Sequence, residues 1–411
     1  MSEAEARAAV VAARDAYGQV LAWLAHQWRD VAAAEDALSD AFEAALRTWP
    51  EKGVPASPQA WLLTAARNRL RNAARGRKMT EDPARRIVLE RAEGEAPTET
   101  IPDTRLRLMF VCAHPAIDRS MHTPLMLQTV LGIEAARLAK VMMLAPETMT
   151  KRLVRVKAKI KTAGLRFEEP EPAELPDRTT AVLDAIYGAY TLETSLESSN
   201  DHSTDLGEEA VFLADLVAGL MPNHAEALGL LALLLFCEAR RPARLDEQGV
   251  FVPLDLQDPS RWDAHLHHKA STILERAARF SAPGPFQIEA AIQSAHCHRI
   301  YGQETPWNAV LMLYEMLLAR WPTLGAHLGH ALALARAHDN PADGLAALDR
   351  LDDPGLDRHQ SWWATRAYLL ERAGRSPEAL EATWKALERT TDLAVRRYLE
   401  VRIGRLREAA H

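Results

Sequence analysis

The sequence has little of what builds disulfide-linked, zinc-binding or membrane-spanning proteins. Its 411 residues include three cysteines, none in a CxxC pair, so neither a disulfide framework nor a zinc knuckle is expected. The longest apolar run, residues 227–236, is too short to cross a bilayer. Residues 1–9 are acidic and rich in alanine, without an apolar signal region. We therefore expect a cytoplasmic chain with no membrane partner.

Aromatic residues are also scarce, at 6% of the chain, and runs of β-branched residues are few. Alanine and leucine dominate instead, and both favour helices. A chain of this length is too long for one hydrophobic core. The composition therefore predicts an all-α protein of two or three domains.

Sequence motifs of catalysis are absent as well. No GxGxxG, P-loop or GxSxG pattern occurs. The metal-like groups are His265, His267 and His268 near Asp263, and the histidines of residues 296–298, but no HExxH-like spacing or second carboxylate accompanies them. We expect packed or solvent-facing histidines, no cofactor, no metal and no catalytic residue. An enzyme with a histidine site is the third alternative, and it would require bound metal.

Charge is distributed unevenly along the chain. The formal net charge is −7, yet residues 137–166 contain nine basic residues and a single acid, Glu147. Such asymmetry suggests a segment that binds a polyanion beside a part with another role.

The same basic stretch has the spacing of a helix-turn-helix. Met149, Leu153, Val156 and Ile160 form one apolar stripe, and Pro146 suits the first helical position. A short helix, a tight turn and a longer helix with a basic free face is the plan of a DNA reader. The alternative is a solvated surface helix. The residues predicted on the free face are Thr148, Lys151, Arg152, Arg155 and Lys159.

A second candidate surface lies near the N-terminus. Asp30 offers a helix cap, and residues 31–49 carry an apolar stripe at helical spacing that includes Phe42 and Leu46. The outer face carries Glu35, Asp36 and Asp40. An acidic face would repel phosphate, so a basic protein partner is expected there unless the face is merely solvated.

The next helix is predicted to carry a row of donors. Residues 50–58 are expected to form a loop because they contain Gly53 and three prolines. Ser57 is the expected cap and Pro58 the first residue of a helix through residue 75. Its predicted buried residues are Leu62, Ala66, Leu70 and Ala73. Its predicted phosphate- and base-binding residues are Arg67, Asn68, Arg71 and Arg75.

Four stretches, taken in order, resemble extracytoplasmic-function (ECF) RNA polymerase sigma factors. They are "AEDALSDAF" (34–42), "GVPASPQAWLLTAARNRLRN" (53–72), "LRLMFVCAHPAI" (106–117) and "APETMTKRLVRVKAKIKTAGLRF" (145–167). A further likeness over residues 227–263 extends the resemblance to the subgroup with a C-terminal helical-repeat extension, whose usual genomic companion is a small DGPF-type protein. The resemblance implies an all-α protein with a region 2 bundle, a helix-turn-helix region 4 and a TPR-like domain.

By this resemblance, Glu35, Asp36 and Asp40 would bind the clamp coiled coil of the largest subunit of core RNA polymerase, and region 4 its flap. Residues 50–58 and the helix carrying Arg67 to Arg75 would open the −10 element of promoter DNA and hold an extruded base. Trp61 is a candidate stacking platform, although core packing is the commoner fate of a tryptophan at its spacing. At the −35 element, Glu147, Thr148, Thr150 and Lys151 would reach base edges, and Arg152, Arg155 and Lys159 would bind phosphates.

The chain departs from the family at the helix-turn-helix. Leu131-Gly132-Ile133-Glu134 stands where the family usually has a Gly-Gly-Leu-Thr-type entry, Ala145 replaces a better helix cap, and "CAHPAI" occupies the place of a common double cysteine. These departures bear on the promoter sequence more than on the fold.

The C-terminal half is predicted to be a helical-repeat domain. Helical patterns recur between turns rich in Pro, Gly, Asp and Asn, and residues 363–391 have the spacing of a tetratricopeptide-type helix pair. Such an array presents a concave surface for a protein or small ligand, the alternative being a structural cap on the first half. The predicted domains are residues 1–78 (region 2), 79–104 (linker), 105–167 (region 4), 168–177 (acidic, Pro-rich linker) and 178–411 (TPR-like regulatory domain).

These observations favour a sigma factor without enzymatic activity. It would direct core polymerase to promoters under the control of its C-terminal extension. The alternative is a helical-repeat adaptor whose sigma-like half no longer binds DNA.

Overall fold

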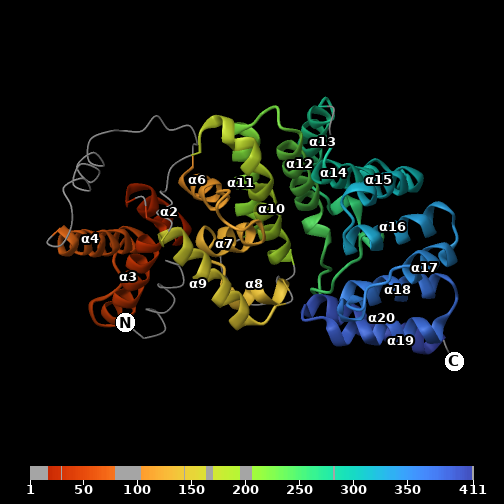
Figure 1. Cartoon of the computed structure of the whole chain (residues 1–411). Coiled ribbons are helices and arrows are strands. Elements are labelled where there is room, and N and C mark those ends of the chain that lie inside the picture. The colour runs from red at the N-terminus through yellow and green to blue at the C-terminus, as the bar shows by residue number, and fades with distance from the viewer. Residues whose placement is uncertain are drawn as a thin grey trace. The chain divides into compact units, whose positions relative to one another are not determined.

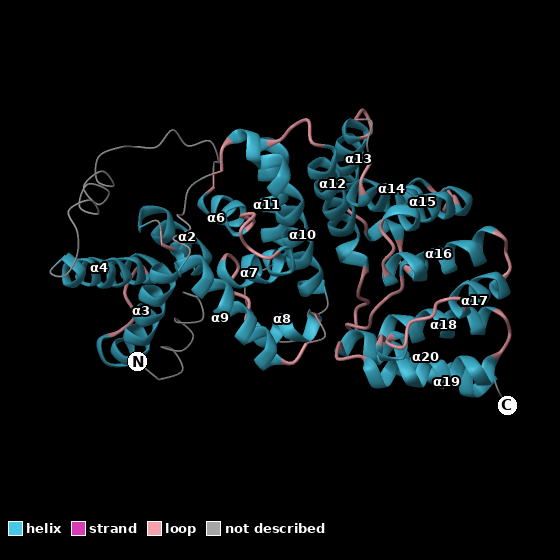
Figure 2. Ribbon diagram, viewed as in Figure 1, coloured by secondary structure: helices cyan, strands magenta, loops and turns pink. Residues whose placement is uncertain are grey.

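The computed structural model describes residues 17–28, 30–78, 103–142, 144–162, 170–194, 206–280 and 283–409. These residues form helices and loops apart from one isolated bridge between Leu245 and Phe251, so the all-α prediction is confirmed (Figures 1 and 2). They fall into two compact units, with the helices up to Leu220 in unit 1 and those from Met221 onward in unit 2. Among them, no helix combines the length and hydropathy that a membrane span requires.

Unit 1 begins with three helices that pack on one another, and Asp30 caps the second of them as predicted, accepting from the Ala33 N–H at 2.9 Å. The prediction that the helix ends at residue 49 was wrong, because it continues through Pro50 to Lys52. Pro50 has no N–H to donate to the carbonyl of Leu46, so one helical hydrogen bond is missing there. The side chain of Leu46 is exposed, although it was predicted to be buried. The three helices are α2 (Tyr17–Trp28), α3 (Val31–Lys52) and α4 (Pro58–Lys78).

The rest of unit 1 packs against these helices. A Cβ atom at Gly18 of α2 would lie 1.8 Å from the carbonyl oxygen of Val130, so glycine is required where α2 meets the end of α7. Helix α2 also packs on α6. The elements are α6 (Thr104–Cys112), η1 (Arg119–Met121), α7 (His122–Thr129), α8 (Ala135–Val141), α9 (Pro146–Thr162), η2 (Pro172–Glu174), α10 (Leu175–Thr194) and α11 (Leu206–Leu220).

Helices α10 and α11 belong to unit 1, although residue 178 was predicted to open the repeat domain. Arg105 of α6 forms ion pairs with Asp103 and with Glu209 of α11, and the buried Arg178 of α10 donates to the carbonyl oxygen of Phe110 at 3.3 Å. These buried cations fix both helices on α6. Helix α10 also begins inside the segment predicted as an acidic linker. The predicted domain limits stay a prediction.

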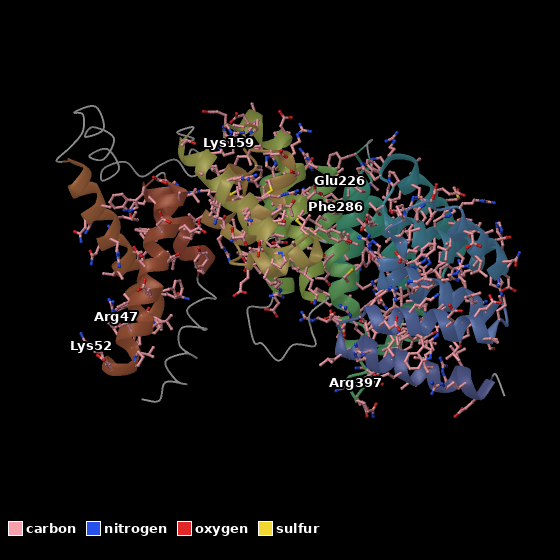
Figure 3. The ribbon with its side chains drawn as sticks, turned by 60° about the horizontal axis from the view of Figure 1, so that its bottom comes forward. Arg47, Lys52, Lys159, Glu226, Phe286 and Arg397 are labelled. Atoms are coloured by element: carbon pink, nitrogen blue, oxygen red, sulfur yellow. The ribbon has the colours of Figure 1, made fainter. Side chains whose placement is uncertain are left out.

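Unit 2 consists of helices that pack on their neighbours in the chain. Glu226 of α12 accepts hydrogen bonds from the N–H groups of Phe286 (2.9 Å) and Gln287 (3.0 Å) at the start of α14, and Figure 3 labels Glu226 and Phe286 side by side. The helices are α12 (Ala225–Arg240), α13 (Ala264–Ala277), α14 (Pro285–Cys297), α15 (Trp307–Arg320), α16 (Leu324–Ala337), α17 (Pro341–Asp349), α18 (Gln360–Arg372), α19 (Ser376–Arg389) and α20 (Leu393–Ala409). The 3-10 turns are η3 (Arg241–Ala243), η4 (Leu254–Leu256), η5 (Pro259–Arg261), η6 (His298–Tyr301) and η7 (Leu356–Arg358).

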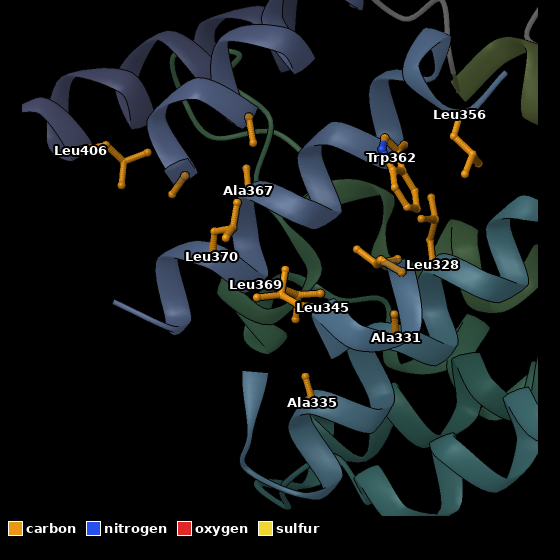
Figure 4. Close-up of a cluster of buried hydrophobic side chains, with 13 residues drawn as sticks. Leu328, Ala331, Ala335, Leu345, Leu356, Trp362, Ala367, Leu369, Leu370 and Leu406 are labelled. Carbon is orange, nitrogen blue, oxygen red and sulfur yellow. The ribbon is translucent and has the colours of Figure 1, made fainter. Parts of the chain in front are cut away.

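The core of unit 2 follows the predicted helix-pair spacing. Ala367, Leu370 and Ala379 are buried where α18 and α19 meet, in a cluster that extends to Leu328 and Leu345 (Figure 4). Small residues let neighbouring helices approach closely, and each pair buries its apolar face against the next. Helices α18 and α19 form the helix pair predicted around residues 363–391, and the term TPR-like stays a prediction.

Candidate nucleic-acid interface

Helix α4 exposes part of the predicted donor row. Ser57 caps the helix, accepting from the Ala60 N–H at 3.4 Å, and Pro58 opens it as predicted. Asn68 and Arg71 are exposed, so an amide and a guanidinium lie about one turn apart on a solvent-facing surface. The side chain of Arg75 lies outside the described residues.

Arg67 does not share that free surface. Its guanidinium carbon lies 5.3 Å from the ring centroid of Trp23 in α2, in a cation–π contact, and the side chain is half-buried. The prediction that Arg67 projects with Asn68 and Arg71 therefore needs correction, because an aromatic ring on a neighbouring helix covers it. The predicted burial of Ala73 was also wrong, since Ala73 is exposed near the end of α4.

Trp61 packs against another tryptophan. Its ring meets the ring of the buried Trp49 edge to face, with centroids 5.5 Å apart. Trp61 itself is half-buried. The contact agrees with the packing role expected for its spacing.

The acidic residues of α3 have three different environments. Asp36 is exposed, as predicted. Asp40 pairs with Arg69 of α4 at 2.8 Å, with the two side chains about half exposed, and a pair so open to solvent contributes little to stability. Arg69 was not predicted as a site residue, and its spacing beside Asn68 and Arg71 gave no sign of this pairing.

Glu35 does not lie on the outer face, contrary to the prediction. Its carboxylate forms an ion pair with Lys157 of α9, and each side chain is less than one-fifth exposed. Burial, and next the Glu35 charge and hydrogen bond, raise the pKa of the Tyr17 hydroxyl. Sequence reasoning missed Lys157 because its partner lies 122 residues away along the chain, beyond the reach of any local spacing rule.

Helices α8 and α9 pack on each other, and their assignment as a DNA-binding helix-turn-helix stays a prediction. Met149 and Leu153 are buried and Val156 and Ile160 are half-buried, as the stripe requires. The opposite face is solvent-exposed except for Thr148, which is half-buried and therefore less accessible to a base than predicted. The exposed predicted residues are Glu147, Thr150, Lys151, Arg152, Arg155 and Lys159.

Local contacts already engage some of these side chains. Lys151 lies 3.8 Å from Glu147, and Lys159, labelled in Figure 3, donates to the carbonyl oxygen of Ala116 at 2.9 Å. Within the described part of the chain, no ion pair engages Arg152 or Arg155. These two guanidinium groups are the α9 cations most available to phosphate.

The thiol between the two candidate surfaces is unreactive. Cys112 of α6 is buried, and burial raises its pKa to about 12, with Lys157 and Glu35 acting in opposite directions. A thiol with such a pKa stays protonated and is a poor nucleophile or metal ligand. Cys112 is therefore a packing residue.

The histidines singled out as metal-like serve other purposes. Asp263 caps α13 by accepting from the N–H groups of His265 and Leu266. His267 is buried between the rings of Phe236 and Tyr301, and His296 packs edge to face on Trp307. Across the described ranges, no group of three or more His, Cys, Asp or Glu residues is arranged to hold a metal ion.

Comparison with known proteins identifies the class of the N-terminal part. The family described as Sigma-70 region 2 matches residues 13–80, which include α2, α3 and α4. The protein is therefore sigma-factor-like, and such a domain implies binding to core RNA polymerase and promoter DNA. Sigma-70 proteins are transcription factors rather than enzymes.

The C-terminal part matches a family of unknown function, DUF6596, over residues 178–278. The chain is also similar to "Uncharacterized protein R00370" of Rhizobium meliloti (strain 1021), at 30% identity over 406 residues, covering 97% of this chain and 95% of the relative. The chain belongs to the same family as that protein. No solved structure matches it significantly.

Proposed function

We propose that this protein is a sigma factor of the ECF type that delivers core RNA polymerase to specific promoters. The observation that carries the proposal is the Sigma-70 region 2 match over residues 13–80. In that region, Asn68 and Arg71 lie exposed on α4, close in sequence to the half-buried Trp61. We assign to this surface the opening of the −10 element, because extruding a base from the stack requires nearby donors and an aromatic or apolar contact.

The second part of the proposal is that α9 reads the −35 element as a recognition helix. The first turn of such a helix contacts base edges, and later turns reach phosphates. Thr150 and Lys151 are the exposed candidates for base contacts, each worth about 1–3 kcal/mol of discrimination. Arg152 and Arg155 are the candidates for phosphate contacts, which add affinity that falls with salt.

The third part is that the C-terminal helices regulate the sigma activity through a bound protein or small ligand. The packing of the C-terminal helices supports a binding role. The helices of unit 2 pack pair upon pair, and arrays of this kind offer extended surfaces to partners. We also propose that the chain belongs to the ECF subgroup with a TPR-like extension.

Run-off transcription with purified core polymerase on the promoter upstream of the protein's own coding sequence tests the proposal. The full chain is compared with a truncation after Leu220 and with one after Asp177. The fragment that ends at Leu220 retains α10 and α11, which pack on α6 through Glu209 and Arg178, so it keeps unit 1 intact. We expect specific transcripts from the full chain and altered transcript levels from the fragment that ends at Leu220. Absence of any specific transcript with the full chain would reject the proposal.

One observation favours the second candidate, a helical-repeat adaptor without DNA binding. Glu35 of the proposed polymerase-binding helix is paired with Lys157 of α9, and both side chains are largely buried, so this carboxylate is not open to a partner in this conformation. Co-purification with core polymerase, combined with a promoter-DNA gel shift, separates the two. The adaptor predicts no polymerase retention and no shift, whereas the sigma factor predicts both.

A further inference from the structure

The chain between α12 and α13 reaches the last helix of unit 2. In residues 248–257 (Figure 2, pink loop), the carbonyl oxygen of Gln248 accepts from Arg397 of α20 at 3.2 Å. The N–H of Phe251 donates to the carbonyl oxygen of Ala394, also in α20, at 3.3 Å. Figure 3 labels Arg397. Residues 248–257, called here the inner segment, thus lie against a helix almost 150 positions further along the chain.

Other contacts also grip the backbone of the inner segment. Arg299 in η6 donates to the carbonyl oxygens of Leu254 at 2.6 Å and of Gln257 at 2.7 Å. Together with the contacts to α20, these bonds hold main-chain atoms, so they do not depend on which side chains the segment carries. Proteins that bind extended peptides obtain much of their affinity through such main-chain bonds.

Two side chains of the inner segment occupy sites formed by the repeat helices. The Asp255 carboxylate accepts from the Tyr368 hydroxyl at 3.4 Å and lies 3.8 Å from Arg336. Arg336 also donates to Tyr368 at 3.0 Å and lies over the ring of Trp307, 4.6 Å from its centroid. The carboxylate site is therefore held in place by helices α15, α16 and α18 without help from Asp255.

The second side-chain site is aromatic. Phe251 meets the ring of Tyr398 in α20 edge to face, with centroids 5.9 Å apart. The two sites thus accept an aromatic ring and, four positions later, a carboxylate.

Most of the inner segment lies on the surface of the repeats, and only Gln257 at its end is buried. Leu256 is 63% exposed, and Asp255 is exposed. The apolar clusters of α14–α16, α16–α19 and α19–α20 contain no residue of the segment. The helices would therefore keep these clusters if the segment left.

We propose that α16, α18 and α20, with Arg299, form a peptide-binding surface that the inner segment occupies in this structure. The external partner is a protein that carries a segment with the same chemistry, an aromatic residue followed four positions later by an acidic one within a 3-10 turn like η4. The tethered inner segment competes with that partner at high effective concentration. The inference concerns unit 2 alone, so it stands or falls independently of the sigma assignment.

The test uses the full chain and a fluorescein-labelled peptide with the sequence of residues 247–258. The variant Phe251→Ala/Asp255→Ala removes both side-chain anchors of the inner segment. In fluorescence anisotropy, we expect the peptide to bind this variant at least about tenfold more tightly than the unaltered chain, since the competing segment is weakened. A peptide with Asn in place of Asp255, and a scrambled peptide, serve as matched controls and should bind poorly to the same variant.

Circular dichroism and thermal melting establish whether the variant folds. Equal binding of the scrambled peptide, or no peptide binding by a folded variant, would overturn the proposal. If the variant does not fold, hydrogen exchange of the unaltered chain decides. Excess peptide should then accelerate exchange in residues 248–257 by displacing them, and unchanged exchange at saturating peptide would reject the inference.

Discussion

Helices α9 and α20 are both 17 residues long and both rich in basic residues, but they use those residues differently. In α20, Arg402 is buried and donates from Nε to Glu371 of α18 at 2.8 Å. In α9, Arg152 and Arg155 point to solvent, and no ion pair of the described residues engages them. The number of cations on a helix therefore says little about whether they can reach an external ligand, which depends on their burial and on the partners they already have.

The largest expected effect comes from breaking the buried pair of α20. Arg402→Ala leaves the Glu371 carboxylate, about one-third exposed, without its main partner. Because Arg402 is buried, its removal takes away both the ion pair and the packing of its alkyl stem, and it leaves a carboxylate that is only partly solvated. We expect a loss of about 3 kcal/mol in the opening free energy of unit 2, measured by native-state hydrogen exchange of the α18 and α19 amides.

Arg405→Ala is the matched control for that substitution. Arg405 lies 3.9 Å from the same Glu371 but is largely exposed, so its removal should cost less than about 1 kcal/mol. Equal losses from the two variants would show that burial does not distinguish the arginines of α20.

The next effect is a pH dependence that belongs to unit 2. Burial, and then the charges of Arg240, Arg299 and Arg336, lower the pKa of His296 from 6.5 to about 4. The unfolded chain takes up this proton first, so protons favour unfolding below pH 6.5. The stability linked to His296 is complete above pH 6.5 and is lost as pH falls towards 4. We expect a loss of about 2 kcal/mol over that range.

Urea unfolding at several pH values, followed by hydrogen exchange in α14–α16, measures this loss. His296→Gln should reduce the dependence between pH 6.5 and pH 4, with the remainder due to His267 and His330, whose pKa values burial also lowers. His265→Gln, at an exposed position of α13, should leave it unchanged. An unaltered slope in the His296 variant would mean that other groups carry the acid sensitivity.

Local sequence patterns predicted many features that lie within one helix or between two consecutive helices. The Met149–Leu153 stripe, the Asp30 and Ser57 caps and the pairing of α18 with α19 follow from spacing and capping rules that act within a few residues. These rules fail at element edges. Leu46 lies at the margin of the α3 stripe and is exposed, and α3 continues through Pro50.

The candidate site was less predictable because its contacts join distant parts of the chain. Glu35 looked like an outer-face residue until Lys157, 122 positions later, was seen to pair with it. Arg67 has the spacing of a free donor, but Trp23 on another helix covers it. Local sequence patterns could not predict the position of the inner segment of unit 2, because arginines elsewhere in the chain hold it by its main chain.

The smallest expected effect concerns the exposed arginines of α9. If Arg155 of α9 contacts a phosphate, Arg155→Ala should weaken binding of the holoenzyme to promoter DNA only several-fold and lower the salt slope by about 1. Arg405→Ala, an exposed arginine of α20, should change neither quantity. Fluorescence anisotropy of labelled promoter DNA with the polymerase holoenzyme, across a salt series, measures both. A loss that depends on the −35 sequence would instead assign Arg155 to a base edge, because phosphate contacts weaken all sequences alike.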